Sequence, residues 1–385
     1  MNARRDRALA LALGGGGARA AYQGGVIAHI GKRMPDFSPP ILTGVSAGSI
    51  NLAFLAGSPG RFGDSSAAIR QAWLRLRTQH VFDASLPRLL WGAVRLGAAV
   101  VAGRNPLSAG FRSVVGTSPL RQILANALPS GAIQSGIDAG RFRSVGISAA
   151  SYQTGRTTLF SQGWSPRAPR QEFSHLRHVF DQIGVEHVMA SAAIPLLFPA
   201  VKIGQQYYGD GSFRSPSPLA PAVRLGADRI FTISTRSRPP GLVPQRADSV
   251  GYPPPARILG LLLNSVFLDT LDWDSAHLER TNELVARLGP ANTRNGPRHI
   301  DLFVLRPSED IGQLAGEFER TLPSGLRRVV RGLSGRRSKT ADFLSYLMFE
   351  PEYLSRLIAL GERDAEANWG AIAAFLSGAG VDHPG

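Results

Sequence analysis

Two glycine-flanked segments, one around Ser46 and one around Asp210, hold the residues best placed to do chemistry. The first is Gly44-Val-Ser-Ala-Gly48, a G-x-S-x-G pentapeptide centred on Ser46. It follows an apolar run and opens a helical pattern, which predicts a sharp strand-to-helix turn that exposes the serine oxygen. The amides at the start of that helix would favour negative charge nearby. Ser46 is therefore a candidate nucleophile, and the plainer alternative is a serine that only caps a helix.

A serine nucleophile also needs a group that stabilises the oxyanion. The Gly14–Gly17 loop suits this role, because glycine lets backbone N–H groups approach a substrate oxygen closely. Gly15-x-Gly17-x-x-Ala20 also loosely fits a dinucleotide-binding fingerprint. That fingerprint calls for an acid at the end of the next strand, but here the next strand ends at Ser46. An oxyanion hole is the favoured interpretation.

The base is harder to find. None of the eight histidines follows a strand in the expected way, and His175 and His178 lack the third ligand that a metal site would need. Asp210 follows a predicted hairpin strand and lies between two glycines. Such an aspartate is most often a simple turn residue. Only its combination with Ser46 makes it a candidate base.

The spacing of apolar residues predicts an α/β fold. An apolar run at 8–13 precedes a helical pattern at 18–34, and a second run at 41–45 precedes another at 46–56. Strand–turn–helix twice in succession indicates a parallel sheet. Further strands are expected at 142–151, 157–161, 200–203, 206–208, 229–234 and 299–305, and helices at 179–193, 258–288 and 341–376.

Four segments taken together resemble the patatin-like phospholipases across about residues 8–235. They are Gly14-Gly-Gly-Gly-Ala-Arg-Ala-Ala-Tyr-Gln, Gly44-Val-Ser-Ala-Gly48, Ala190-Ser-Ala-Ala-Ile-Pro-Leu-Leu-Phe-Pro-Ala-Val and Asp210-Gly211. The resemblance implies a three-layer α/β sandwich with a mostly parallel central sheet flanked by helices. It places a catalytic core at 8–240 with a helical lid insertion at about 73–135. A mainly helical C-terminal part at 250–380, with one strand at 299–305, would pack on this core.

The resemblance also implies a Ser–Asp dyad, with Ser46 as the nucleophile and Asp210 as the base. Burial would disfavour the charged carboxylate and so strengthen the base. No metal or organic cofactor is needed. The remaining residues implied are the oxyanion-hole group Gly15, Gly16, Gly17 and Ala18, the elbow glycines Gly44 and Gly48, and the supporting residues Arg19 and Gly211.

Two positions depart from the family pattern. Ala20 stands where glycine is usual, and Ser212 stands where glycine or alanine is usual. Ala20 would be strained if its position required a positive φ. Ser212 could donate a hydrogen bond to Asp210 and weaken it as a base.

Composition indicates a globular chain with an excess of arginine. Hydrophobic residues make up 43%, the formal net charge is +15, and cysteine is absent, which excludes disulfides and thiolate sites. Two acid-free stretches, 84–137 and 321–340, carry much of the excess. Compositional bias, an ordinary helix pair and a solvated basic loop are the plainer explanations; contact with an anionic membrane is the alternative. Nucleic acid fits poorly, because neither stretch interleaves aromatic residues.

We expect a soluble, cytoplasmic protein without a signal peptide or transmembrane helix, and peripheral contact with a membrane is an open alternative. The apolar run near the N-terminus is too short, and 37–60 is interrupted by proline and glycine. The function favoured is a phospholipase or lysophospholipase acting on a phospholipid or another acyl-ester lipid. The alternatives are a soluble carboxylesterase or thioesterase with the same dyad, and a non-catalytic lipid-binding regulator.

Overall fold

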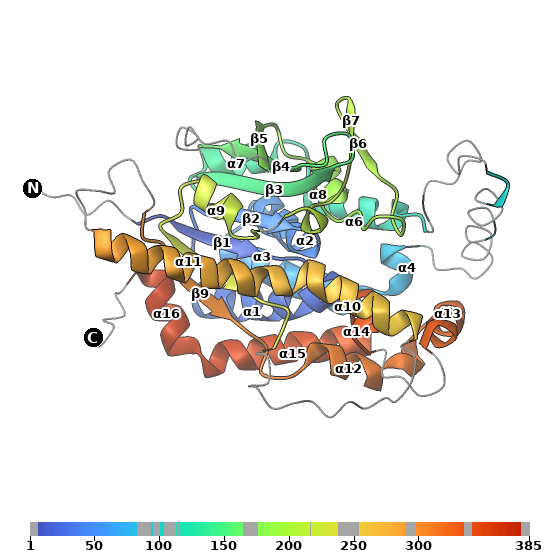
Figure 1. Cartoon of the computed structure of the whole chain (residues 1–385). Helices are drawn as coiled ribbons and strands as arrows, with labels where there is room; N and C mark the ends of the chain where they lie inside the picture. Colours follow the sequence, from blue (N-terminus) through green and yellow to red (C-terminus); the bar gives the residue numbers. More distant parts are fainter. Residues whose placement is uncertain are drawn as a thin grey trace, which may run out of the picture.

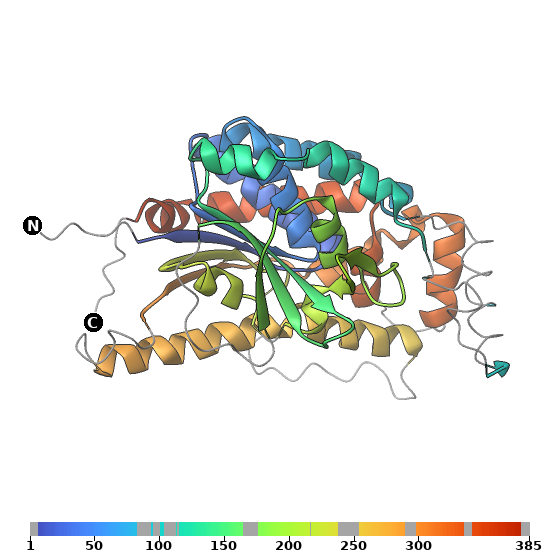
Figure 2. The same ribbon diagram turned by 90° about the horizontal axis from the view of Figure 1, so that it is seen from above.

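The computed structural model describes residues 7–82, 94, 101–103, 113, 115–164, 176–215, 217–237, 254–288, 298–334 and 341–378. Within them, a nine-stranded sheet lies between two layers of helices (Figures 1 and 2). The expected three-layer α/β architecture with a mostly parallel sheet is confirmed. None of the helices described is both long and apolar enough to cross a bilayer.

The strands run in the order β5-β4-β3-β2-β1-β8-β9, and β7 pairs antiparallel with the end of β3, on the edge that β3 shares with β2. The pairs β2–β1, β1–β8, β8–β9 and β2–β3 are parallel. The central strands β1 and β2 are buried along their whole length, as expected for apolar runs covered on both faces. The bounds are β1 Leu9–Leu13, β2 Ile41–Val45, β3 Ser144–Ser151, β4 Thr157–Gly163, β5 Leu176–Phe180, β6 Val201–Ile203, β7 Gln206–Asp210, β8 Arg229–Ile233 and β9 Asp301–Leu305.

Helices α1, α2, α3 and α15 share the larger apolar core on one face of the sheet, and α9 and α11 pack on the other (Figure 2). The bounds are α1 Ala20–Arg33, α2 Ala47–Gly57, α3 Phe62–Arg75, α4 Thr78–Val81, α6 Ser118–Ala127, α7 Ala132–Asp138, α8 Val185–Ser191, α9 Ala220–Arg224, α10 Pro255–Phe267, α11 Asp269–Leu288, α12 Ile311–Glu317, α13 Ser324–Ser334, α14 Ala341–Leu347, α15 Pro351–Ala367 and α16 Trp369–Ser377. Two 3₁₀ turns, η1 Gly17–Arg19 and η2 Gly211–Phe213, follow the ends of β1 and β7.

The C-terminal helices are joined to the core by a close crossing of α1 and α15. A Cβ placed at Gly25 would stand 2.2 Å from the Ile358 carbonyl oxygen, so the two backbones touch. Beside the crossing, the buried Tyr22 hydroxyl donates to Asp364 at 3.0 Å. Burial next to this carboxylate raises the pKa of Tyr22 well above its ordinary value, which keeps the hydroxyl a donor. These contacts hold α1, the helix that follows the glycine loop, against α15.

Several sequence-based boundaries were wrong. The single helix expected at 179–193 is strand β5 followed by α8, because Gly184 has an extended backbone and starts the helix there. The helix expected at 258–288 is divided at Leu268 into α10 and α11. Leu268 and Phe267 are both buried in one apolar cluster at this point. The basic loop favoured for part of 321–340 is helix α13, since Leu326 and Val330 lie four residues apart and are both buried.

Most of the predicted arginine-rich surface falls outside the described residues. This applies to Arg88, Arg95, Arg104, Arg112, Arg336, Arg337 and Lys339. It applies equally to the middle of the expected lid, from 83 to 112 apart from a few isolated positions. Of the first stretch, Arg121 is described, and it forms an exposed ion pair with Glu186. Of the second, the arginines of α13 are described.

Candidate active site

Ser46 occupies a strained turn between β2 and α2. Its φ of 53° and ψ of −129° are unusual for a residue with a side chain, and such strain is typical of functional sites. Glycine is required on both sides. A Cβ at Gly44 would stand 2.8 Å from the Ser49 Cα, and one at Gly48 would stand 2.1 Å from the Leu13 carbonyl oxygen. The G-x-S-x-G pattern therefore reflects close backbone approaches around the turn.

Ser46 and Asp210 lie in direct contact, although 164 residues separate them. The Ser46 hydroxyl donates a hydrogen bond to Asp210 Oδ2 at 2.5 Å, and both residues are buried. Strand β3 brings them together, because β2 and β7 pair with the same edge of β3, one after the other. The pairing with β2 ends at Val45 and Ser148, and the pairing with β7 begins at the next residue of β3, where Ala149 lies opposite Asp210. Strand β4 occupies the other edge of β3. The Asp210 amide also donates to the Ala193 carbonyl at 2.8 Å, which holds the end of β7 against the segment after α8.

The environment of Asp210 makes its carboxylate unusually basic. Burial raises the pKa of Asp210 to about 7, while hydrogen bonds from the Ser46 hydroxyl and the Ser212 amide act in the opposite direction. The Ser212 hydroxyl makes no hydrogen bond of ordinary geometry to any described residue. It nevertheless lies near the carboxylate and lowers the pKa of Asp210, as the Ser212 amide does. A carboxylate with a pKa near neutrality can accept a proton from a serine.

The glycine loop lies against Ser46. A Cβ at Gly15 would stand 3.1 Å from the Ser46 Cβ, and Gly17 lines the cavity that contains Ser46. Gly16 and Gly17 have φ values of 148° and 57°, which a side chain would make unfavourable. Ala18, in η1, is fully buried and is not one of the residues that line this cavity. Ala20 has a φ of −67°, so its methyl group introduces no strain.

Arg19 faces away from Ser46 and joins the glycine loop to α14. Its side chain is 3% exposed, with Nε donating to the Ser345 hydroxyl at 2.7 Å. One of its terminal nitrogens lies 3.2 Å from Asp342 Oδ1. The guanidinium also stacks 4.4 Å from the centroid of the Tyr346 ring. Arg19 thus contributes to the position of the loop rather than to the inside of the cavity.

Gly211 lies in close contact with the Ser148 carbonyl, where a Cβ would be 2.3 Å from the oxygen.

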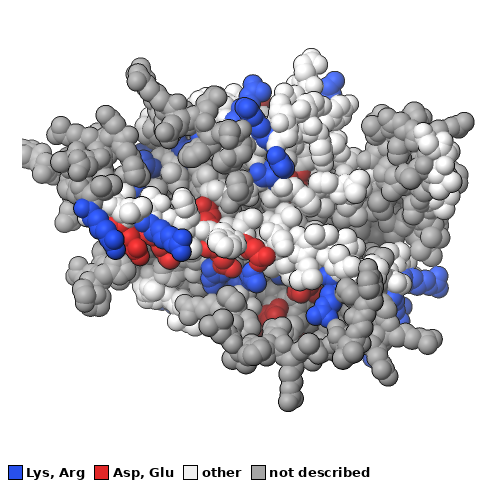
Figure 3. All heavy atoms as spheres, in the orientation of Figure 1, with Lys and Arg blue, Asp and Glu red and all other residues white. Residues whose placement is uncertain are grey.

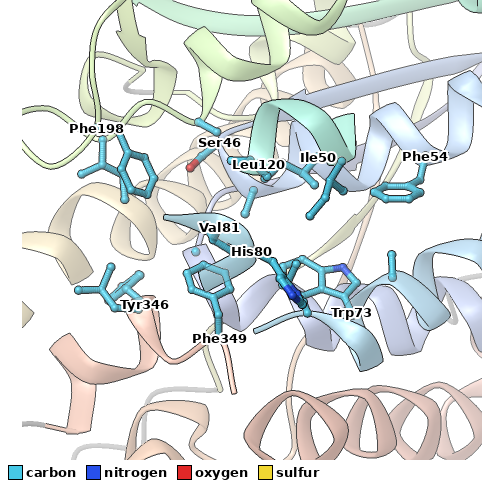
Figure 4. Close-up of a pocket in the computed structure, with 18 of the residues that line it drawn as sticks. Ser46, Ile50, Phe54, Trp73, His80, Val81, Leu120, Phe198, Tyr346 and Phe349 are labelled. Atoms are coloured by element: carbon cyan, nitrogen blue, oxygen red, sulfur yellow. The ribbon is translucent and has the colours of Figure 1, made fainter. Parts of the chain in front are cut away.

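The cavity beside Ser46 is the main feature that inspection of the sequence missed. Its volume is about 240 Å³ and its lining is almost entirely apolar (Figure 4). Ile50 and Phe54 lie on successive turns of α2, which begins directly after Ser46, so the lining extends over about 12 Å from Ser46 to Phe54. Figure 4 shows Phe54 at one end, with Phe198 and Tyr346 on the other side of Ser46. Its walls come from all parts of the chain: Ala72, Trp73, Leu76, His80, Val81, Leu120, Ile123, Ile194, Phe198, Tyr346, Leu347 and Phe349.

Ser191 is a second residue whose place the sequence did not reveal. Its hydroxyl accepts a hydrogen bond from the Ser46 amide at 3.0 Å and donates one to the Ser148 carbonyl at 2.7 Å. The side chain therefore bridges the strained turn and β3. The sequence contained a signal only in the Ala190-Ser-Ala-Ala segment, which carried part of the family resemblance but indicated no role for the serine.

Comparison with known proteins agrees with this fold. The family model of patatin-like phospholipases matches residues 11–223, more than half of the chain. The chain therefore belongs to the patatin-like phospholipase family. No curated protein is significantly similar to it in sequence.

Solved structures that resemble the chain do so distantly. Human GIVD cytosolic phospholipase A2 in complex with methyl gamma-linolenyl fluorophosphonate is 14% identical, with a TM-score of 0.46. The match covers 97% of this chain but 59% of the human one, so the chain spans less than two thirds of that protein. VipD from Legionella pneumophila is 12% identical, with coverage of 92% and 67% and a TM-score of 0.33. The type III effector ExoU is 14% identical, with coverage of 92% and 53% and a TM-score of 0.28.

Proposed function

We propose that this protein is a serine lipid acyl hydrolase of the phospholipase or lysophospholipase type. The observation that carries the proposal is the 2.5 Å contact between the Ser46 hydroxyl and Asp210 beside an apolar cavity that Ser46 lines. An apolar cavity of this shape suits an acyl chain, whose burial is favourable by roughly 0.8 kcal/mol for each methylene. The ester carbonyl would then lie beside Ser46.

The reaction divides into two acyl transfers. The Ser46 oxygen attacks the ester carbonyl while its proton passes to Asp210. Collapse of the tetrahedral intermediate breaks the bond to the alcohol, which leaves with the proton from Asp210. A water molecule then gives a proton to Asp210 and attacks the acyl group on Ser46. The fatty acid leaves, and the proton returns to the serine oxygen.

Negative charge on the tetrahedral oxygen would be stabilised from two sides. The glycine loop, whose Gly15 lies against Ser46, would supply backbone N–H groups from Gly15 to Ala18 as the proposed oxyanion hole. Helix α2 begins at Ala47, immediately after the nucleophile, so the positive end of its dipole lies at the site. Both groups are in place before the substrate binds, which avoids reorganisation during the reaction.

Labelling with a fluorophosphonate probe tests the proposal. The probe's phosphoryl group bonds to an activated serine, so peptide mapping should find it on Ser46 of the wild-type protein. Labelling should be lost in Ser46→Ala and in Asp210→Asn. Asp274→Asn is a matched control, because Asp274 is also a largely buried aspartate with a raised pKa but is hydrogen-bonded to Ser217 and Leu219. A folded wild-type protein that resists the probe would favour a non-catalytic lipid-binding protein instead.

Activity on different physical forms of substrate separates the two enzymatic alternatives. A lipid hydrolase should accelerate when a long-chain ester passes from monomers to micelles or vesicles. A soluble carboxylesterase or thioesterase would show no such increase and would prefer short, dissolved esters.

A further inference from the structure

Helix α10 presents large aliphatic side chains to solvent. Ile258 and Leu259 are 38% and 37% exposed, and Leu261 and Leu262 are 61% and 58% exposed. On a surface helix of this kind the outer face is normally polar. The inner face of α10 is already occupied by Ala256, Gly260 and Phe267, which are buried. The helix is thus apolar on both sides, and its outer side has no partner among the described residues.

The same helix touches the candidate active site from the other side. Asn264 accepts a hydrogen bond from the Tyr346 hydroxyl at 2.8 Å, and Tyr346 lines the apolar cavity. Phe267 lies so close to the glycine loop that a Cβ at Gly15 would stand 2.8 Å from its ring. Because a helix is about 10–12 Å across, the outer face of α10 lies about one helix diameter from the glycine loop.

Cations outnumber acids around α10. The helix contains no acidic residue, and α13, which packs against it, contributes Arg327, Arg328 and Arg331. The acids nearby are already paired with arginines, since Asp342 of α14 contacts Arg19 and Glu319 contacts Arg331. Figure 3 shows an uncharged surface where Figure 1 places α10, while charged residues of both signs gather along α11 to its left. Blue side chains lie to its right, toward α13. An apolar patch beside a cluster of cations is the chemistry of a peripheral contact with anionic lipid.

A further exposed leucine lies in the loop that borders the cavity. Leu196 is 73% exposed and has a φ of 66°, which is a strained value for a leucine. Its neighbours Ile194 and Leu197 pack on the cluster that includes Phe267 of α10. Leu196 and α10 therefore flank the same buried cluster.

We propose that the outer face of α10, together with the arginines of α13, docks on the surface of an anionic phospholipid membrane. This inference rests on the proposed function, because it explains how a buried acyl-chain site would reach substrate packed in a bilayer. Burial of the exposed aliphatic groups in the interface drives docking. The arginines contribute attraction to the lipid phosphates, which weakens as salt screens it.

A second copy of the chain is a poorer occupant for this surface. In a two-fold symmetric dimer the same patch would contact itself. Arg327 and Arg328 of the two α13 helices would then be brought near one another with no acidic residue on α10 or α13 to compensate, whereas Arg331 is already paired with Glu319. Like charges at an interface oppose association. An anionic lipid surface supplies the opposite charge.

Vesicle flotation with the full chain tests the proposal. The Ser46→Ala background prevents hydrolysis, and the vesicles are phosphatidylcholine with or without a minor fraction of phosphatidylserine. We expect strong binding only with phosphatidylserine. The double variant Leu261→Ser/Leu262→Ser should reduce the partition coefficient on the order of 100-fold. The variant Arg327→Gln/Arg328→Gln should reduce it roughly 20-fold at low salt and much less at high salt.

Matched variants on α11 serve as controls. Leu284 is 58% exposed, as Leu262 is, so Leu284→Ser removes a similar apolar group elsewhere. Arg280→Gln/Arg287→Gln removes two exposed arginines from the same helix. Both controls should bind vesicles as the parent does. Equal losses in the α10 and α11 variants, or none in the α10 variant, would overturn the proposal.

Two further measurements separate this inference from the proposed function. Leu261→Ser/Leu262→Ser in the otherwise wild-type chain should keep its activity on a dissolved short-chain ester while losing activity on vesicles. If the protein binds vesicles through α10 but hydrolyses no ester, the docking proposal holds and the proposed hydrolase function is refuted. A fall in molar mass from dimer to monomer in this variant would instead identify a second copy as the occupant.

Discussion

The Ser46 amide and the Ser191 hydroxyl are joined by a hydrogen bond of 3.0 Å, and the same hydroxyl donates to the Ser148 carbonyl. The bond restrains a turn whose backbone is strained, so Ser191 positions the proposed nucleophile. We expect Ser191→Ala to lower kcat about 10- to 100-fold with little change in KM, because small displacements of a nucleophile are costly. Steady-state kinetics on a dissolved ester, together with the rate of fluorophosphonate labelling, would measure this.

Ser144→Ala is the matched control for Ser191→Ala. Ser144 is a fully buried serine of β3 whose hydroxyl has no partner among the described residues. Its removal should change neither kinetics nor stability appreciably. Ser191→Ala should also reduce the free energy of unfolding by about 1–3 kcal/mol, because it leaves a buried amide unpaired. A variant that lost stability but kept its kcat would show that Ser191 is only structural.

Activity should depend on the ionisation of Asp210. Burial raises the pKa of Asp210 to about 7, and the proposed base must be ionised to accept a proton. We therefore predict that kcat/KM rises with pH and levels off above a midpoint near 7. A pH–rate profile on a dissolved ester measures this, and Asp274→Asn should retain the profile. A plateau that extends down to the ordinary aspartate pKa would contradict the role given to Asp210.

The same shift predicts how stability depends on pH. Because the pKa of Asp210 is higher in the folded than in the unfolded protein, folding favours the protonated form. The free energy of unfolding should therefore fall as pH rises from about 4, the unfolded value, towards 7. Asp210→Asn carries no charge and should lack this component. Thermal melts should show it gaining Tm relative to the wild type across that interval, and an identical pH dependence in the two proteins would refute the shift.

Arg19 should matter for both stability and activity, although it lies outside the cavity. Arg19→Ala would remove the bond to Ser345, the contact with Asp342 and the stacking on Tyr346. We expect a loss of about 3 kcal/mol in the free energy of unfolding and a clear fall in kcat, since the adjacent glycine loop loses its support. Denaturant melts and ester kinetics would measure the two effects.

Two further variants serve as controls for Arg19→Ala. Arg19→Lys keeps the charge but not the planar fork, so it should recover only part of both losses. Arg33→Ala removes an arginine at the end of α1 that is 43% exposed and paired with Glu366, and should cost less than about 1 kcal/mol without affecting kcat. Full recovery by lysine would mean that charge alone is required.

The cavity should determine the length of acyl chain accepted. Phe54 lies at the end remote from Ser46, so Phe54→Ala should shift the preference towards longer chains. Ile50→Phe should obstruct the cavity one turn from Phe54 and favour short chains, by about tenfold or more in the ratio of kcat/KM values. A series of esters of increasing chain length would measure the profile.

Leu55→Ala is the control for the cavity variants. Leu55 is buried on α2 but does not line this cavity. The substitution should cost about 2–5 kcal/mol of stability and leave the chain-length profile unchanged. An unchanged profile in Phe54→Ala and Ile50→Phe would mean that the acyl chain binds elsewhere.

The sequence predicted the local parts of this site well. A short apolar run, a glycine on each side of Ser46 and a helical pattern after it were sufficient to predict the strand, the turn and the helix, because these depend on neighbouring residues. The strands predicted at 142–151 and 157–161, and at 200–203 and 206–208, are confirmed for the same reason, and each pair forms an antiparallel hairpin. Helix α13 was not predicted, because the run of basic residues without acids favoured a solvated loop. The spacing of Leu326 and Val330 was the signal for a helix.

Contacts between distant segments were decided only by the tertiary structure. Asp210 in isolation was an ordinary turn residue, and it reaches Ser46 because β7 pairs with the edge of β3 directly beyond the end of β2. Likewise, no local pattern marks Ser191, Tyr346 or the outer face of α10. The sequence by itself determined which residues could react and where the chain would turn. Packing determined which of them meet and how far Asp210 is removed from water, because proximity and burial are properties of the whole fold.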